Sequence, residues 1–374
     1  MTKRADRIVV LLFALFLGAF FLLNLAIPDK EESDQENRRL QTLPEFSFRS
    51  LFAGRFTMDF ESYCSDQFVG RDGWVSLKAR LELLQGKKEN NGIYLCEGER
   101  LIEPFAAPSA AELDRRVQIV NTLGENVDVP VTLALIPTAA ELYAELLPKG
   151  APNDSEREII DYLYSSVISA GTVDLLSPLS AHREEDLFYR TDHHWTSLGA
   201  FRGYEGLAEP LGFLSRERSA YTEKTVSDSF RGTACSSSGF FWVSPDTMEI
   251  FREPPEGLTV EKHESGAVSS ASLYEESMLL TKDKYRFFLG GNTPRAVLRT
   301  GNQDLPSLLI LRDSYADSLA PFLLDHFSEI HLLDLRYYRG SVQAYISDND
   351  IDQVLILYSV SNFCTDTNLA LMTR

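Results

Sequence analysis

The longest apolar run of the chain lies at its N-terminus. It extends over residues 8–27, is interrupted only by Gly18 and Asn24, and follows the short basic segment 2–7. A helix of about twenty residues is roughly 30 Å long, which matches the hydrocarbon core of a bilayer. Positive charges before such a helix keep its start in the cytoplasm, which predicts that the rest of the chain is exported. The length of the run favours an uncleaved anchor over residues 1–27 rather than a cleavable signal peptide.

A charged linker and two helices are predicted after the apolar run. Residues 29–39 are rich in charged side chains. Aromatic residues then recur at helical spacing between Phe52 and Tyr63, which is typical of one packing face of a helix. A second helix is predicted over 74–84, where Gly86 provides a C-terminal cap. We therefore treat residues 28–88 as a linker with an N-terminal helical region.

Beyond residue 89, apolar runs of strand length alternate with helix-like segments. The clearest runs are 129–137, 285–289, 307–311, 330–335 and 354–358. Continuous apolar runs of this kind are typical of strands that are covered on both faces. Alternation of strands and helices with short connections predicts a parallel sheet wrapped by helices. The fold class expected for residues 89–374 is therefore α/β, with an irregular insertion of loops and short strands at about 215–280, where Ser, Thr, Gly and Glu are frequent.

Composition and charge narrow the classes of function. The apolar fraction of 44% and the charged fraction of 24% are those of a folded protein. A net charge of -19 argues against nucleic acid as a partner, because phosphate contacts need clustered Lys and Arg. The four cysteines (Cys64, Cys96, Cys235 and Cys364) have no CxxC spacing, which excludes a zinc ribbon and leaves their disulfide state open.

A candidate nucleophile follows one of the buried strands. Ser314 comes just after the apolar run 307–311, at the start of a predicted helix. In a parallel sheet, sites lie beyond the carboxyl ends of the strands. A serine on such a turn is exposed, and neighbouring amides can stabilise an oxyanion. Asn362 follows another strand, and its amide is a second candidate for the same oxyanion.

A serine needs a base, and the best acid–imidazole pair lies in the segment 189–195. There Asp192 stands two residues before His194 and three before Trp195. The pair predicts that His194 takes the serine proton and that Asp192 orients the imidazole. We expect His193 to pack under the turn rather than to take part.

Each of these residues also has an alternative role. Asp192, His193 and His194 together could ligate a metal, although adjacent histidines point to different faces of an extended segment and no further ligand stands at a suitable spacing. We therefore predict no metal site and no cofactor. Ser314 could be a helix N-cap. Trp195 could belong to the core or to a sugar-binding surface.

The chain resembles the DHHW protein family of Gram-positive bacteria, which is similar to the alginate O-acetyltransferase branch of the SGNH hydrolases. The motifs that carry the resemblance are Tyr-Arg-Thr-Asp-His-His-Trp at 189–195, Arg-Asp-Ser-Tyr-Ala at 312–316, Glu-Asn-Arg-Arg-Leu at 36–40, Phe-Arg-Gly-Thr at 230–233 and Leu-Gly-Gly-Asn at 289–292. The resemblance implies an SGNH-hydrolase-like three-layer sandwich with a central parallel sheet.

Residue roles follow from the resemblance by position. Asp192 and His194 match the Asp-x-His pair of that branch, and Ser314 matches the nucleophile. Asn362 matches the third-block asparagine by its place after a strand. Arg312 stands where the SGNH serine block opens with glycine. The residues expected to contact the oxyanion or the substrate are Asn362, Arg312, Trp195 and Tyr315.

Three functions remain open at this point. The first is a membrane-anchored O-acetyltransferase for a cell-surface or secreted polysaccharide, for which the resemblance implies a membrane-bound acyltransferase that supplies acetyl groups. The second is a carbohydrate esterase or deacetylase that uses the same Ser-His-Asp triad. The third is a non-catalytic glycan-binding envelope protein. In each case we expect a single-pass membrane protein with its main domain outside the cell, or a secreted protein if the N-terminal segment is cleaved.

Overall fold

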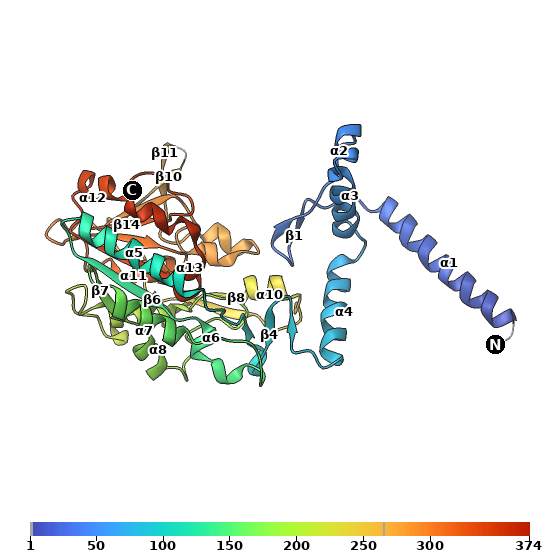
Figure 1. Cartoon of the computed structure of the whole chain (residues 1–374), viewed down its shortest axis with the longest axis horizontal. Coiled ribbons are helices and arrows are strands. Elements are labelled where there is room, and N and C mark those ends of the chain that lie inside the picture. Colours follow the sequence, from blue (N-terminus) through green and yellow to red (C-terminus); the bar gives the residue numbers. More distant parts are fainter. Residues whose placement is uncertain (1–2, 265) are drawn as a thin grey trace. The chain divides into compact units, whose positions relative to one another are not determined.

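The chain divides into two structural units. A computed structural model describes residues 3–264 and 266–374 (Figure 1). The first unit contains the chain up to Asn90 together with residues 236–242. The second unit contains residues 91–235 and 243–374.

The first unit is mainly helical. Its elements are α1 (Lys3–Ala26), β1 (Glu32–Ser33), β2 (Arg38–Arg39), α2 (Phe48–Phe52), α3 (Arg55–Asp66), α4 (Arg71–Leu84) and β3 (Glu89–Asn90). The segment Arg4–Ala26 of α1 is long and apolar enough to cross a bilayer. The two helices predicted after the linker are confirmed as α3 and α4.

The aromatic residues of α2 and α3 do not form the packing face that their spacing predicts. The Phe56 and Phe60 rings stack with their centroids 5.9 Å apart, yet the side chain of Phe60 is exposed. Phe52 is 87% exposed. The helical spacing therefore predicted the helix correctly but predicted the burial of its aromatic face wrongly. Spacing does not show whether a partner surface is present.

Helix α1 makes specific contacts within its own unit. The Phe20 ring stacks on the Phe68 ring at 5.6 Å, and it lies 5.8 Å from the ring of Trp74. The Asn24 side chain accepts a hydrogen bond from the backbone N–H of Val69 at 2.8 Å. These contacts join α1 to the turn between α3 and α4.

An eight-stranded sheet forms the second unit. Its order is β11 (Ala267–Ala271), β10 (Thr259–Glu264), β12 (Arg295–Arg299), β14 (Glu329–Leu333), β13 (Ser307–Arg312), β15 (Gln353–Ser359), β6 (Val131–Ile136) and β7 (Gly171–Asp174). The strands from β14 to β7 pair in parallel, as the apolar runs predict. The strands β11, β10 and β12 add to this sheet in antiparallel pairs, which the sequence pattern does not predict.

Helices and small strands surround this sheet (Figure 1). The helices of the second unit include α5 (Ala110–Asn126), α6 (Ala139–Leu142), α7 (Glu156–Ser166), α8 (Leu176–Ala181), α9 (Ser197–Leu207), α11 (Ala316–Leu323), α12 (Val342–Asp348) and α13 (Val360–Thr365). Helix α10 (Thr233–Ser238) begins in this unit and ends in the first. The remaining strands, outside the eight-stranded sheet, are β4 (Ile93–Leu95), β5 (Leu101–Ile102), β8 (Lys224–Phe230) and β9 (Asp246–Ile250).

The core lies on the central strands. Every residue of β13 and every residue of β6 is buried, as is all of β15 except Gln353. Apolar side chains on both faces exclude water from these strands, which is the main driving force for the fold. The strands β13 and β15 are direct neighbours, so their carboxyl ends meet at one edge of the sheet. Ser314 and Asn362 therefore emerge on the same edge, as predicted.

One predicted strand is wrong. Residues 285–289 include a short 3-10 helix, η5 (Lys284–Phe287), instead of a strand. Leu289, Gly290 and Gly291 follow with positive φ angles of 54°, 67° and 88°, which turn the chain and prevent an extended pairing. A short apolar run does not distinguish a strand from a buried helical turn.

The insertion contains loops and short strands, as predicted. It contributes the antiparallel pair β8–β9, the strand β10 and the edge strand β11. Cys64, Cys96 and Cys364 are free thiols, of which the last two are buried. The disulfide question left open by the sequence is thereby answered for these three residues.

Candidate active site

The candidate nucleophile lies on a tight turn between β13 and α11. Ser314 is half-buried, and its carbonyl oxygen accepts a hydrogen bond from the Asp317 N–H at 3.2 Å in the first turn of α11. The turn itself is held by Asp313, which is 1% exposed. One oxygen of Asp313 accepts from the Tyr315 N–H at 3.1 Å. The other accepts from the N–H and the hydroxyl of Ser359 at the end of β15, both at 2.9 Å.

The histidine loop is a small hairpin. Phe188 and Trp195 form an isolated antiparallel bridge, and the Tyr189 N–H donates to the His194 carbonyl at 3.1 Å. Asp246 of β9 fixes the tip of this loop. Its carboxylate accepts hydrogen bonds from the N–H and the hydroxyl of Thr191, at 2.8 and 2.6 Å.

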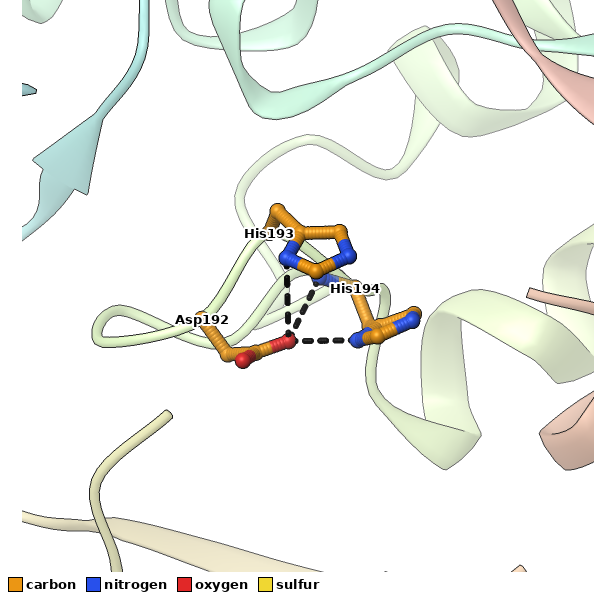
Figure 2. A group of neighbouring side chains, drawn as sticks. All are labelled: Asp192, His193 and His194. Carbon is orange, nitrogen blue, oxygen red and sulfur yellow. Dashed lines mark hydrogen bonds and ion pairs between the residues drawn. The ribbon is translucent and has the colours of Figure 1, made fainter. Parts of the chain in front are cut away.

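Ser314, His194 and Asp192 form a continuous hydrogen-bonded chain. The Ser314 Oγ and the His194 Nε2 are 2.7 Å apart, although 120 residues separate them in the sequence. The His194 Nδ1 and the Asp192 Oδ1 are 2.5 Å apart (Figure 2). The same Asp192 oxygen accepts the His194 backbone N–H at 2.9 Å. The proximity that the sequence predicted is present, and this arrangement suits proton transfer between a serine and a base.

Thr233 binds the second oxygen of Asp192. The Asp192 Oδ2 accepts hydrogen bonds from the Thr233 N–H at 2.7 Å and from its hydroxyl at 3.0 Å. Gly232 permits this approach, because a Cβ on Gly232 would lie 2.1 Å from the Asp192 Oδ2. Thr233 belongs to the Phe-Arg-Gly-Thr motif at 230–233, so a signal for it was present, but the motif alone assigned it no role.

Tyr285 covers the imidazole of His194. The two rings stack with centroids 3.7 Å apart and planes inclined by only 8°. The Tyr285 hydroxyl donates to the Ser314 carbonyl at 3.3 Å and lies 3.0 Å from the Ser318 hydroxyl. Tyr285 therefore touches both the base and the nucleophile turn. Sequence reasoning missed it, because the residue was assigned to a strand.

Burial determines the protonation of the pair. Burial and the positive charge of a protonated His193 lower the pKa of His194 to about 4, although the Asp192 carboxylate opposes this shift. Burial alone would raise the pKa of Asp192, but the charges of the two histidines and the bonds to its oxygens hold that pKa below its ordinary value. At neutral pH the imidazole is therefore unprotonated and the carboxylate is charged, as a general base and its orienting group require.

His193 lies beside His194 instead of beneath the turn. Its side chain is 43% exposed, and its Nδ1 is 2.6 Å from the Thr233 hydroxyl. The two imidazole centroids are 3.9 Å apart, so the expectation that adjacent histidines face opposite ways is corrected as well. The tight turn that allows Asp192 to cap the His194 N–H replaces the extended backbone on which that expectation rested.

A metal site requires ligand atoms that lie close together. Those of Asp192, His193 and His194 lie within 4.8 Å of one another (Figure 2). The same atoms already serve other partners. The Asp192 Oδ1 and the His194 Nδ1 share a hydrogen bond, and both oxygens of Asp192 accept backbone N–H groups. A cation at this position would have to displace these bonds. The donor set therefore fits a hydrogen-bonded relay better than a metal centre.

Three residues expected to contact the substrate are instead buried. Trp195 is fully buried against α9, where a Cβ on Gly203 would lie 2.7 Å from its ring, and its Nε1 donates to the Tyr315 carbonyl at 3.0 Å. Tyr315 is 1% exposed, and its hydroxyl donates to the His193 carbonyl. Arg312 is fully buried, and it pairs with Asp317 at 3.1 Å. Because these three side chains are buried, a sugar cannot contact them. They support the site by packing inside the fold.

Asn362 takes part in the support of the nucleophile turn. Its side-chain amide donates to the Asp313 Oδ2 at 2.8 Å, and it is half-buried. This bond uses one of the two amide hydrogens of Asn362. The other hydrogen remains available to an oxyanion.

Comparison with known proteins places these residues in a family. The model of the DHHW protein family matches residues 102–333. Probable alginate O-acetylase AlgJ of Pseudomonas syringae pv. tomato is 25% identical over 213 residues, which are 54% of this chain and 51% of that protein. The same enzyme of Azotobacter vinelandii is 27% identical over 187 residues, or 46% and 48% of the two chains. The chain thus spans about half the length of these curated relatives.

Solved structures share the fold. A DHHW family protein from Eubacterium siraeum is 25% identical, with a TM-score of 0.66 over 76% of this chain and 95% of its own. Bacillus cereus PatB1 with a sulfonyl adduct is 21% identical, with a TM-score of 0.65 over 75% and 98% of the two chains. The likeness to PatB1 concerns the fold alone.

Proposed function

The chain belongs to the DHHW protein family, and from this membership and the geometry at Ser314 we propose that it is an acyltransferase that moves acetyl groups onto a polysaccharide outside the cytoplasm. The observation that carries the proposal is the hydrogen-bonded chain from Ser314 through His194 to Asp192. The arrangement of the second unit around a mostly parallel sheet fits an SGNH-like three-layer sandwich.

In the first half of the proposed reaction, Ser314 accepts the acetyl group. The Ser314 Oγ attacks the acetyl carbonyl while the His194 Nε2 takes its proton. The tetrahedral intermediate collapses, and the leaving group departs with the proton from His194. Asp192 holds the His194 Nδ1–H throughout and stabilises the transient imidazolium. The product is an acetyl ester on Ser314.

In the second half, a glycan hydroxyl takes over the acetyl group. His194 removes the hydroxyl proton as the oxygen attacks the acetyl carbon. The bond between that carbon and the Ser314 Oγ then breaks, and His194 returns the proton to Ser314. The same residues with water as acceptor give the alternative, an acetyl esterase. The names of the relatives, alginate O-acetylases, favour transfer over hydrolysis.

The developing oxyanion needs donors near Ser314. The N–H of Tyr315 already donates to Asp313, whereas that of Ser314 donates to no acceptor in the described part of the chain. We propose that the Ser314 N–H binds the oxyanion, assisted by the uncommitted amide hydrogen of Asn362. The feature that most favours the third alternative, a non-catalytic envelope protein, is Arg312 in place of a glycine. The burial of Arg312 and its pairing with Asp317 remove it from the path of a substrate.

The contacts of α1 support an uncleaved anchor. Phe20 and Asn24 lie inside the span that a signal peptidase would remove, and both contact residues of the first unit. We propose a single-pass membrane protein with its second unit outside the cytoplasm. A membrane-bound acyltransferase would then supply acetyl groups across the bilayer.

The test uses the full-length protein in detergent with p-nitrophenyl acetate as donor. Mass spectrometry of the quenched protein should find an acetyl group on Ser314, and a sulfonyl fluoride should block it. Addition of an oligosaccharide should divert the acetyl group from water to the sugar. The variant Ser314→Ala should lose the acyl-enzyme, whereas Ser361→Ala, also half-buried, should retain it. An unlabelled Ser314 in active protein would refute the proposal.

A further inference from the structure

A polar cavity of about 250 Å³ opens beside the nucleophile turn. It lies beyond the carboxyl ends of the parallel strands β14, β13 and β15, because its lining includes Arg336, Asp313 and Tyr358, which stand at or after those ends. Asp313 directly precedes Ser314. One water occupies about 30 Å³ of liquid volume, and pockets for drug-sized ligands have volumes of roughly 300–1,000 Å³. The cavity is therefore too large for a single water and suits one sugar ring.

Two residues of the cavity lining, Tyr358 and Asp366, each carry a buried polar atom without a hydrogen-bond partner among the described residues. These atoms are the hydroxyl of Tyr358 and the Oδ2 of Asp366. Tyr358 as a whole is 1% exposed. Buried polar atoms are almost always paired, and such an exception points to a partner from outside the chain, either water or a ligand that displaces it. A phenol donates a hydrogen bond and a carboxylate accepts one, which is what a pair of sugar hydroxyls can satisfy.

The Asp366 carboxylate is fixed in place. Its Oδ1 accepts hydrogen bonds from the N–H and the side-chain amide of Asn368, both at 2.8 Å. The Asp366 backbone N–H donates to the Asn362 carbonyl at 2.8 Å, and its carbonyl accepts from the Arg116 guanidinium. Because Oδ1 is fully used, Oδ2 is the oxygen that remains for a ligand. A rigid acceptor of this kind costs little entropy when it binds.

The charged side chains around the cavity favour sugars without a negative charge. The Arg336 guanidinium is the one cation that lines the cavity within the described residues, and it already binds both oxygens of the buried Asp334, at 2.9 and 2.7 Å. Asp313 and Asp366 add two further carboxylates. The local balance is therefore negative, in a chain whose net charge is -19. A carboxylated sugar would meet like charges here, which disfavours it against a neutral or cationic one.

We propose that this cavity is an acceptor subsite that holds one non-anionic sugar ring, with two ring hydroxyls bonded to Tyr358 and Asp366. The inference rests on the proposed function and names its acceptor class. It also separates this chain from its alginate-modifying relatives, because alginate is a polymer of uronic acids and every ring carries a carboxylate. Because Asp313 lines the subsite and directly precedes Ser314, a glycan that occupies the subsite lies next to the nucleophile turn.

The experiment measures binding without catalysis. Isothermal titration of the full-length Ser314→Ala protein would use β-1,4-linked tetramers of glucose, glucosamine and mannuronate as probes. We expect the glucose or the glucosamine tetramer to bind at least tenfold more tightly than the mannuronate tetramer. Equal or tighter binding of mannuronate, or binding of none of the three, would overturn the subsite. If a tetramer binds but Ser314 is never acetylated in the wild-type protein, the subsite stands and the proposed function fails instead.

Variants connect the binding to the cavity. In the Ser314→Ala background, Tyr358→Phe should weaken the preferred tetramer about fivefold and Asp366→Asn about tenfold. Because the Tyr358 hydroxyl lacks a partner, its removal should leave the melting temperature unchanged or raise it, which a structural hydroxyl would not do. The matched control is Tyr189→Phe, which removes another buried hydroxyl that has no partner among the described residues and lies outside the cavity lining. Unchanged affinity in both cavity variants would contradict the assignment.

Discussion

Ser314 and His194 meet within hydrogen-bond distance, but the two sides of this contact are held in different ways. Asp313 ties the serine turn to the end of β15, so the position of Ser314 follows from the packing of neighbouring parallel strands. The histidine loop instead depends on Thr233 and Asp246, which belong to the insertion. The sheet therefore positions the nucleophile, whereas the insertion positions the base. Changes in the insertion should therefore affect the base first.

The largest expected effect comes from removal of either end of the contact. Ser314→Ala and His194→Ala should each lower kcat/KM for p-nitrophenyl acetate by about 10³-fold or more, because neither atom works without the other. The double variant should be no slower than the slower single variant. Steady-state kinetics on folded protein, with folding checked by thermal melting, provides the measurement. Multiplicative effects would mean that the two sides act independently.

The two buried aspartates provide the next largest contrast. Asp192→Asn should lower kcat by about 10²–10⁴-fold with little change in KM, because the amide presents the wrong tautomer to His194. Asp313→Asn should act chiefly on stability, with a loss of about 2 kcal/mol, because the amide nitrogen would face either the donor from Tyr315 or those from Ser359 and Asn362. Kinetics and chemical denaturation of both variants separate the two roles. A similar kcat loss in both would break the distinction.

A smaller effect should follow from a change in the insertion alone. Thr233→Val removes the hydroxyl that donates to the Asp192 Oδ2 and leaves the backbone N–H in place. We expect kcat to fall by about tenfold or somewhat more, because a hydrogen bond to a charged group contributes about 1.5–3 kcal/mol. Thr233→Ser should restore most of the activity. The exposed Thr225→Val, on strand β8 of the same insertion, is the control and should behave like the wild type.

The pH dependence of kcat/KM depends on the protonation of His194 and not on Ser314. Because the pKa of His194 is lowered to about 4, kcat/KM should stay constant through neutral pH and fall tenfold per pH unit below about 4. In the unfolded chain a histidine binds its proton near pH 6.5, so stability should also decrease as the pH falls from about 6.5 toward 4. An acid limb near pH 6.5 would show that His194 is more solvated than its burial indicates.

The smallest effect is expected at His193. Its charge, when protonated, lowers the pKa of His194. His193→Ala should change kcat at neutral pH by less than about threefold and move the acid limb to higher pH. A large loss at neutral pH would give this exposed histidine a direct role in the reaction.

Sequence patterns were sufficient for the parts of the site that follow from regular structure. Ser314 could be found because it follows a fully apolar strand, and His194 because an acid stands two residues before it. Their proximity followed from the parallel order of the strands, which the apolar runs of β13, β15 and β6 predict. Local pattern and global fold agree at these positions.

The remaining parts depend on tertiary contacts that leave no periodic pattern. Thr233 contacts Asp192 only because the insertion folds back, and Tyr285 contacts His194 only because a 3-10 turn replaces a strand. Burial was also misjudged. Trp195 lies beside the catalytic candidates in sequence, yet the glycines of α9 open a space that takes its ring into the core. Nearness in sequence does not predict which side of a backbone reaches solvent.

Gly232 has a consequence for how such chains can change over evolutionary time. Its α-carbon lies so close to Asp192 that any side chain would push into the carboxylate, with a Cβ only 2.1 Å from one oxygen. The position therefore tolerates no substitution as long as Asp192 orients a base. Among chains with the same motifs, a larger residue at this point would mark those that have lost the reaction while keeping the fold. The residue at position 232 would therefore identify inactive chains from their sequences alone, without any assay.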